Sequence, residues 1–197
     1  MNNMIPIKRA GDEMSRIPSY KDEQSLREKL RDVSFEHWLK EDLFSFNWWL
    51  LLAASILPFF IWWRLVDKGR FFEILAFGLL CAIFACFLDV VGLNFILWGY
   101  PDKLFHFIPP LVPADFVVIP ISGMLIYQYF NTWKSYAAAA VGLGIMFAYI
   151  FEPLFSFLNM FVLINWKHTY SFIGFIIFFL GVRLLMVSLK RAAEKIK

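Results

Sequence analysis

The sequence contains few of the residues on which disulfide-linked scaffolds and soluble domains depend. Only two of its 197 residues are cysteines, Cys81 and Cys86, and both lie in one apolar stretch. This placement argues against a disulfide framework and against a cysteine-based zinc site. Charged residues make up 18% of the chain, and its net charge of +3 is too small to indicate nucleic acid as a partner. No apolar stretch follows Met1, so we expect no cleavable signal peptide.

Apolar residues dominate instead. Hydrophobic residues make up 60% of the chain and aromatic residues 20%, whereas soluble domains hold about 45–50% apolar residues. Residues 1–43 carry 8 Lys/Arg and 9 Asp/Glu, against 11 and 7 in the rest of the chain. This division predicts a multi-pass protein of the cell membrane. We expect a polar N-terminal tail (1–43), a transmembrane bundle (44–189) and a short basic C-terminal tail (190–197).

The polar tail contains one segment with helical periodicity. Ser19 followed by Asp22 is the pattern of a helix start, and Leu26, Leu30 and Val33 recur at helical spacing. We expect an amphipathic helix that lies on the membrane surface and leads into the first span.

Five apolar segments predict an all-α, polytopic helical bundle, because a spanning helix needs about 20 apolar residues. The predicted spans are residues 44–63, 71–92, 113–131, 135–157 and 169–189. Arg183 lies six residues from the end of the last predicted span, so its long side chain is expected to reach the interface.

The third span is irregular. Its apolar part, residues 116–130, would be roughly 22 Å long as a helix, against a hydrocarbon core of about 30 Å. The missing depth must come from residues 107–115, which contain three prolines and cannot form a regular helix. Non-helical backbone persists at membrane depth only where protein or a water-filled cavity covers it. We therefore expect a broken or re-entrant segment over residues 100–120, and this segment points to a functional site.

Two acidic residues within the spans, Asp89 and Glu152, form the candidate acid/base pair. An ionised carboxylate in the bilayer costs about 2.5–3.5 kcal/mol, so such residues usually face the bundle interior and have a function. Asp89 lies 18 residues after Phe71, and Glu152 lies 17 after Ser135. If every segment crosses the membrane, both carboxyl groups lie at one depth. If they meet, one acts as a general acid; alternatively, both only cap helices or pair with Arg or Lys.

Further polar and aromatic residues are expected at the same interface, where they would contact a ligand. These are Asn94, Trp98, Tyr100, His106, Asp115 and Trp166. No ligand spacing such as H-x-x-x-H or E-x-x-H accompanies the histidines, so we expect no metal site. The sequence has no Ser/His/Asp arrangement, P-loop or dinucleotide fingerprint, and we expect no cofactor.

Five short motifs follow one another in a distinctive order. They are Trp63-Arg-Leu-Val-Asp-Lys68, Leu88-Asp-Val-Val-Gly92, Trp98-Gly-Tyr-Pro101, Tyr127-Gln-Tyr-Phe-Asn-Thr-Trp133 and Phe151-Glu-Pro153. By their order and spacing, residues 36–175 resemble a family of small, functionally uncharacterised polytopic membrane proteins of spore-forming Firmicutes. The resemblance implies a bacterial polytopic membrane protein and implies no reaction.

A looser resemblance is to small membrane-bound isoprenoid cyclases, in which acidic residues near the interface protonate an alkene or an epoxide. This resemblance implies the acid role for Asp89 and Glu152. It also implies that aromatic faces stabilise a carbocation, with Trp98, Tyr100, Phe107 and Trp166 as the candidates.

Three classes of function remain open. In the first, the chain is a membrane protein of unassigned molecular role whose polar cluster organises the fold or a partner. In the second, it is an acid-catalysed enzyme that acts on a lipid or an isoprenoid. In the third, it is a proton-coupled transporter, which the broken third segment favours and the lack of a second broken helix and of an inverted repeat disfavours. Membrane lipids are the expected partners, together with a hydrophobic small molecule if the chain is an enzyme.

Overall fold

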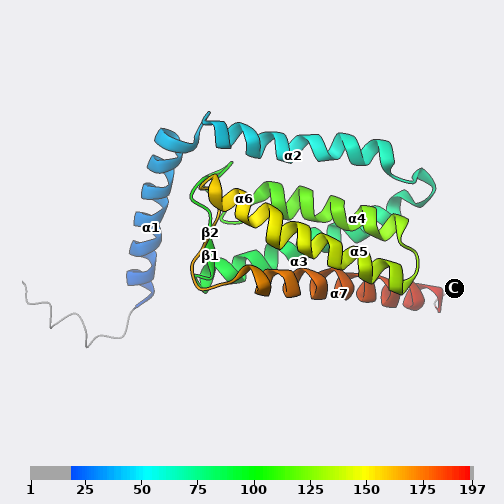
Figure 1. Cartoon of the computed structure of the whole chain (residues 1–197). Helices are drawn as coiled ribbons and strands as arrows, with labels where there is room; N and C mark the ends of the chain where they lie inside the picture. The colour runs from blue at the N-terminus through cyan, green and yellow to red at the C-terminus, as the bar shows by residue number, and fades with distance from the viewer. Residues whose placement is uncertain (1–18, 196–197) are drawn as a thin grey trace, which may run out of the picture.

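The fold is an all-α bundle with the architecture of an integral membrane protein, seen here in a computed structural model that describes residues 19–195 (Figure 1). Four helical stretches are long and apolar enough to cross a membrane. They are α2 (Phe46–Leu65), α3 (Phe71–Asn94) with the preceding turn Lys68–Arg70, α5 (Trp133–Met146) continued by α6 (Glu152–Phe157), and α7 (His168–Glu194). The long helices run side by side along one direction (Figure 1).

A shorter apolar stretch, Ala114–Tyr129, lies among these helices. It consists of a π-helical turn, Ala114–Val118, followed by α4 (Ile119–Tyr129). The chain before it, residues 100–113, contains no regular helix apart from its last two residues. Leu104 and Leu111 of this segment are buried against Leu51 of α2 and against Met160. The third segment is therefore broken, as the prolines predict, and its non-helical part is anchored to the bundle at Leu104 and Leu111, whereas Phe105 and Phe107 are exposed.

The N-terminal helix α1 (Tyr20–His37) lies across the end of the bundle rather than along it (Figure 1). The Asp22 carboxylate accepts a hydrogen bond from the backbone N–H of Ser19 at 2.7 Å, so the helix begins where the Ser19/Asp22 pattern predicts. None of the residues of α1 is buried. This exposed placement across the bundle end is the one expected of a helix that lies on a membrane surface.

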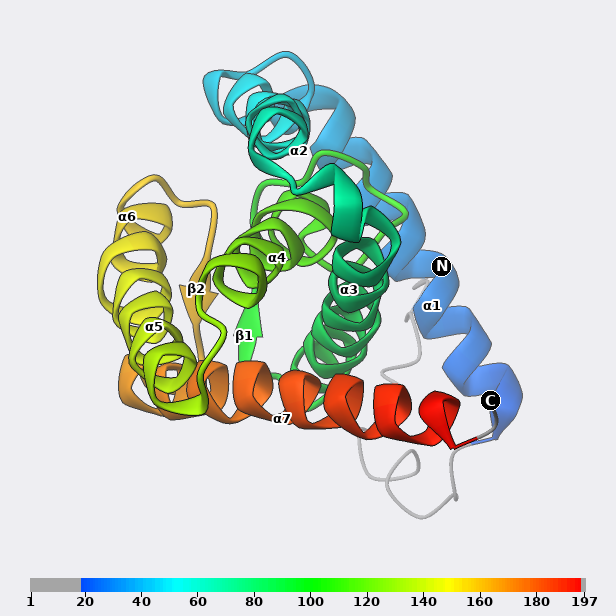
Figure 2. The ribbon, with the colours of Figure 1, turned by 90° about the vertical axis from the view of Figure 1, so that its right-hand side faces the viewer.

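Seen along the bundle, α3, α4, α5 and α7 surround a common core, and α2 lies apart from α7 (Figure 2). The core contains the fully buried side chains of Phe77, Tyr136 and Phe179. By contrast, α2 packs chiefly against α4 and the π-helical turn before it, and most of its surface is exposed. One face of α2 is therefore available to lipid.

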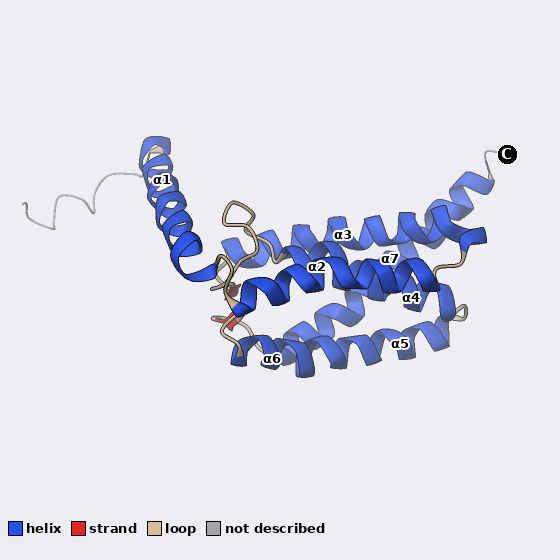
Figure 3. Ribbon diagram, turned by 90° about the horizontal axis from the view of Figure 1, so that it is seen from above, coloured by secondary structure: helices blue, strands red, loops and turns tan. Residues whose placement is uncertain are grey.

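Two very short strands join the loops at the end of the bundle nearest α1. Strand β1 (Trp98–Gly99) pairs antiparallel with β2 (Val162–Leu163), with Trp98 opposite Leu163. The pair connects the loop after α3 to the loop after α6. Figure 3 shows these loops gathered near α1, whereas the C terminus lies at the opposite end of the bundle.

Within residues 19–195, three π-helical turns interrupt the helices, at Trp38–Asp42, Ala114–Val118 and Phe147–Phe151. Each of them lies at a carboxylate. Asp42 ends the first turn, Asp115 lies within the second, and Glu152 directly follows the third. A π-helical turn holds one more residue than an α-helical turn and occurs frequently at functional sites. The periodicity of the sequence does not predict these turns.

The side chain of Arg183 reaches the loop between α4 and α5 at one end of the bundle, which is the direction expected from its position in the chain. Its side chain is only 6% exposed and donates hydrogen bonds to the carbonyl oxygens of Phe130, Asn131 and Thr132, which follow α4. Phe130, Asn131 and Thr132 are themselves exposed, so Arg183 holds a loop at the surface of this end of the bundle.

Candidate functional site

A cavity of about 530 Å³ lies in the half of the bundle nearest β1 and β2. Its wall is mostly apolar and is formed by α2, α3, α7, the segment that begins α4, and the π-helical turn before α6. Cavities of about 300–1,000 Å³ with an apolar lining and a few convergent polar groups are typical of small-molecule sites. The convergent polar groups here are carboxyl groups.

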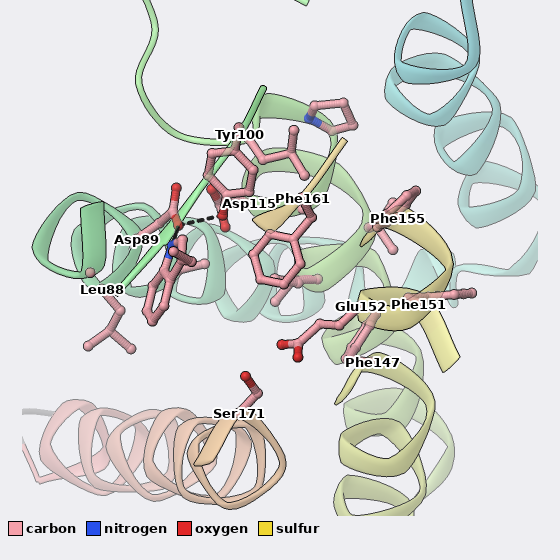
Figure 4. Close-up of a pocket in the computed structure, with 18 of the residues that line it drawn as sticks. Leu88, Asp89, Tyr100, Asp115, Phe147, Phe151, Glu152, Phe155, Phe161 and Ser171 are labelled. Atoms are coloured by element: carbon pink, nitrogen blue, oxygen red, sulfur yellow. Dashed lines mark hydrogen bonds between the residues drawn. The ribbon is translucent and has the colours of Figure 1, made fainter. Parts of the chain in front are cut away.

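Asp89 of α3 is the most extensively hydrogen-bonded of these carboxyl groups (Figure 4). It is only 5% exposed, and its Oδ1 accepts hydrogen bonds from Trp98 Nε1 at 2.7 Å and from the Tyr100 hydroxyl at 2.6 Å. Burial, together with the charge of Asp89, raises the pKa of Tyr100 well above its usual value, so the hydroxyl remains a donor. Two donors therefore favour Asp89 as a hydrogen-bond acceptor.

Local structure explains how both donors reach Asp89. Trp98 and Tyr100 are two residues apart in extended chain, so their side chains lie on the same face. The Trp98 indole lies directly on Gly92, where an added Cβ would be 2.0 Å from the ring atom Cζ2. The Trp166 ring also contacts Trp98, with 5.4 Å between the ring centroids. The absence of a side chain at Gly92 thus permits the Trp98–Asp89 hydrogen bond.

Asp115, from the π-helical turn, lies beside Asp89 and is also 5% exposed. The two carboxyl groups are neighbours, close enough to interact. Within the described chain, Oδ2 of each has no hydrogen-bond partner. Two neighbouring carboxyl groups in an apolar site disfavour ionisation of both, so one of them retains a proton. The structure therefore contains a carboxyl pair, and its members are Asp89 and Asp115.

Glu152 belongs to a second polar group, on another part of the cavity wall. Its Oε2 lies 2.7 Å from His168 Nδ1, and the Ser171 hydroxyl lies close to the same carboxyl group. Ser171 Oγ in turn accepts a hydrogen bond from Trp166 Nε1 at 3.0 Å. Figure 4 shows the Glu152 carboxylate and the Ser171 hydroxyl pointing toward the cavity.

Asp89 and Glu152, matched in depth by the sequence, thus line the same cavity. Within residues 19–195 no hydrogen bond joins them. The reason is the direction in which each helix presents its carboxyl group: α3 directs Asp89 toward Asp115, whereas α6 directs Glu152 toward His168 of α7. The rise per residue predicts depth along a helix, but the rotation of the helix about its axis depends on packing.

Four of the six expected ligand-contacting residues line the cavity: Trp98, Tyr100, Asp115 and Trp166. The other two lie elsewhere. Asn94 is exposed and donates to the carbonyl oxygen of Val90 at 2.7 Å. His106 packs against Phe35 and Trp38, with ring centroids 4.9 and 5.5 Å away, and so joins α1 to the end of the bundle.

Two residues that were not among the predicted site residues, His168 and Ser171, complete the site. His168 lies 16 residues from Glu152 along the chain, and a loop and β2 separate them. The sequence does not predict that these two residues are in contact. It shows only that polar residues occur at the start of the last predicted span.

Comparison of the chain with protein-family models, with curated proteins and with solved structures finds no match. The class of protein is therefore inferred from the fold and the cavity alone. The chain is an integral membrane protein with carboxyl groups in an apolar cavity.

Proposed function

We propose that the protein is a membrane-embedded enzyme that takes a lipid or an isoprenoid into the cavity and transfers a proton to it. The two buried carboxyl groups of Asp89 and Asp115, which adjoin each other in an otherwise apolar cavity with Oδ2 of each lacking a donor among the described residues, are the observation that carries the proposal. Acid catalysis requires a carboxyl group that retains a proton near neutral pH, and adjacent carboxyl groups in an apolar site provide one. In this proposal the protein resides in the cell membrane, where lipids are its direct partners.

Asp115 is the proton donor in this mechanism. Trp98 and Tyr100 both donate to Asp89, which favours the ionised form of Asp89 and leaves the retained proton on Asp115. When Asp115 protonates a carbon–carbon double bond, its O–H bond breaks and a C–H bond forms. The electron pair of the double bond becomes that C–H bond, and the neighbouring carbon becomes a carbocation.

The remaining steps need no co-reactant. Aromatic faces in the wall, such as those of Tyr100, Phe147 and Phe161, stabilise the carbocation. Loss of a proton from a different carbon to the Glu152 carboxylate forms a new double bond. Proton exchange with solvent then returns Glu152 and Asp115 to their starting states. The substrate gains one proton and loses one, so the reaction is an isomerisation or a cyclisation.

The position of the cavity supports delivery of the substrate from the bilayer. Leu50 and Ala54 of α2, together with Phe151 and Phe155 on the α6 side, line the cavity and are partly exposed. Because α2 packs chiefly against α4 and its preceding turn, the wall between α2 and α6 is loosely closed. An apolar substrate dissolved in lipid can enter between these helices.

The test is a comparison of lipid extracts by mass spectrometry. Cells that express the wild-type chain are compared with cells that express Asp115→Asn at equal protein level. We expect a product with the mass of its substrate but a different retention time, present only with wild type. Asp67→Asn is the matched control, because Asp67 is exposed at the opposite end of the bundle, and we expect it to retain the product. If wild type and Asp115→Asn give identical extracts in a host that contains isoprenoids and polyunsaturated lipids, the proposed enzymatic activity is refuted.

A further inference from the structure

A second cluster of ligating side chains lies outside the cavity, where α1, α2 and the loop after β1 meet. His37 ends α1, Asp42 ends the π-helical turn that follows it, and Asp102 belongs to the loop. One ligand atom from each of the three lies within 4.8 Å of the others. His37 Nε2 and Asp42 Oδ1 are 3.3 Å apart. These residues take no part in the proposed proton transfer.

A neighbouring donor holds one oxygen of each carboxylate, and the other oxygen of Asp42 faces His37. Asp42 Oδ2 accepts the backbone N–H of Lys103 at 3.0 Å, and Asp102 Oδ2 accepts the Asn47 side-chain amide. Asp42 is only 2% exposed, and its Oδ1 has no hydrogen-bond donor among the described residues. A buried carboxylate oxygen without a donor is unfavourable unless a cation neutralises it. The oxygen faces His37, the one nitrogen ligand of the cluster.

We propose that His37 Nε2, Asp42 Oδ1 and a carboxylate oxygen of Asp102 bind a divalent transition-metal ion of the Zn²⁺ type. Tetrahedral zinc with bonds of about 2.0–2.2 Å separates its ligand atoms by about 3.3–3.5 Å, and the observed His37–Asp42 separation fits one such edge. An imidazole ligand favours zinc and its neighbours over Ca²⁺ or Mg²⁺. The His37 side chain is half exposed, so water can occupy the fourth position.

The surroundings match those of a metal site. Lys103 and Asn47 orient the two carboxylates in the way that hydrogen-bonding neighbours orient metal ligands. The charges that act on Asp42 are those of His37, Asp102 and Lys103. With His37 neutral, two carboxylates outweigh one ammonium group, so the cluster attracts a cation. The spacing of the ligands, four residues between His37 and Asp42 and a third ligand far along the chain, matches no common motif.

A bound ion would hold α1 and the start of α2 to the loop that carries Tyr100. Tyr100 lies two residues before Asp102 and donates to Asp89 in the cavity. The ion would therefore stabilise the end of the bundle at which the cavity lies. This role is independent of the reaction proposed above, and it persists if the cavity binds a ligand without catalysis.

Zinc binding to the purified full chain, in detergent and without a histidine tag, tests the proposal. After treatment with a chelator and its removal, ZnCl₂ is titrated in competition with a chromogenic chelator. We expect one Zn²⁺ per chain and the strong visible absorption of tetrahedral Co²⁺ when CoCl₂ replaces it. His37→Gln and Asp42→Asn should lower the affinity by at least about 100-fold, and Asn47→Ala by about 10–100-fold.

Two further measurements separate binding from misfolding. Zn²⁺ should raise the Tm of the wild-type chain and leave that of His37→Gln unchanged, because only a specific site stabilises the folded state. His37 is half exposed, so its substitution should not prevent folding. The control Glu41→Gln removes an exposed carboxylate next to Asp42 and should bind zinc as wild type does. No binding to the wild-type chain, or equal affinity in wild type and in His37→Gln, would overturn the proposal.

Discussion

At the scale of single residues, the site depends on a glycine, Gly92, whose lack of a side chain leaves room for a neighbouring ring. Gly92 follows Asp89 by three residues in α3, and the Trp98 indole occupies the space where a Cβ at Gly92 would lie. The indole nitrogen reaches Asp89 Oδ1 only from this position. The sequence shows Leu88-Asp-Val-Val-Gly92 as a motif, and the structure gives the physical reason for its last residue.

We predict that Gly92→Ala displaces the indole and breaks the Trp98–Asp89 hydrogen bond. Overpacking of this kind costs about 1–3 kcal/mol, so the free energy of unfolding in detergent should fall by that amount and the product of the proposed reaction should decrease. Gly142→Ala is the control, because a Cβ at Gly142 meets no atom within 4 Å. The free energy of unfolding of Gly142→Ala should equal that of the wild-type chain or exceed it by up to about 1 kcal/mol, because alanine favours the helix over glycine. If Gly92→Ala and Gly142→Ala lower the free energy of unfolding equally, the proposed role of Gly92 in making room for the Trp98 indole is contradicted.

At the scale of elements, the sequence predicts what depends on neighbouring residues along the chain. The spans follow from apolar length, the start of α1 from Ser19 and Asp22, and the break in the third segment from its prolines. The π-helical turns and the strand pair leave no periodic pattern, and so they escape prediction. The pairing of Asp89 with Asp115 escapes it too, since it depends on how α3 rotates against the segment that begins α4.

One side chain connects two elements at the end of the bundle opposite the cavity. Arg183 of α7 donates to three consecutive carbonyl groups, at 2.9 Å to Phe130 and 3.3 Å to Thr132, with Asn131 between them. Its guanidinium also lies over the rings of Trp133 and Tyr136. Arg183 thus supplies donors to the carbonyl groups of Phe130 and Asn131, which follow the last turn of α4, whereas the Thr132 carbonyl also accepts the backbone N–H of Tyr136 at 3.0 Å.

We predict that Arg183→Leu removes the side-chain donor of the Phe130 and Asn131 carbonyl groups and lowers the free energy of unfolding by about 3 kcal/mol. Arg183→Lys should recover part of the loss, because an ammonium group can contact one or two of the three. Unfolding followed by circular dichroism in mixed micelles measures both. Lys134→Leu, at an exposed position near the same end, should change stability by less than about 0.5 kcal/mol. An unchanged midpoint for Arg183→Leu would show that the three hydrogen bonds contribute nothing.

At the scale of the whole molecule, the two ends of the bundle differ in construction. One end holds α1, the strand pair, the cavity and the His37–Asp42–Asp102 cluster. The other holds Arg183 and a network in which Glu73 accepts from Arg70, Tyr127 and Lys190. Between them, α2 forms the side of the cavity that is most exposed to lipid. The carboxyl groups of the cavity thus lie toward one end of the bundle, and ion pairs of Glu73 lie at the opposite end.

We predict that a large side chain at Ala54 closes the route from the bilayer. Ala54→Trp projects an indole into the cavity wall beside α2 and should reduce product formation at least about 10-fold, while circular dichroism shows an unchanged fold. Leu57→Trp places the same side chain on the same helix at an exposed position outside the cavity lining, and it should have wild-type activity. If Ala54→Trp also has wild-type activity, the substrate enters by another route.

The exposure of the cavity between α2 and α6 also affects how affinity must be measured. A ligand that arrives through the membrane is diluted by lipid or detergent and hardly at all by water. Its mole fraction in the micelle or bilayer therefore determines how much of the protein is occupied. Doubling the detergent at constant ligand and protein halves that mole fraction and doubles the apparent Kd expressed in molar units, although no contact has changed. Affinities for this site are comparable only when they are expressed per molecule of surrounding amphiphile.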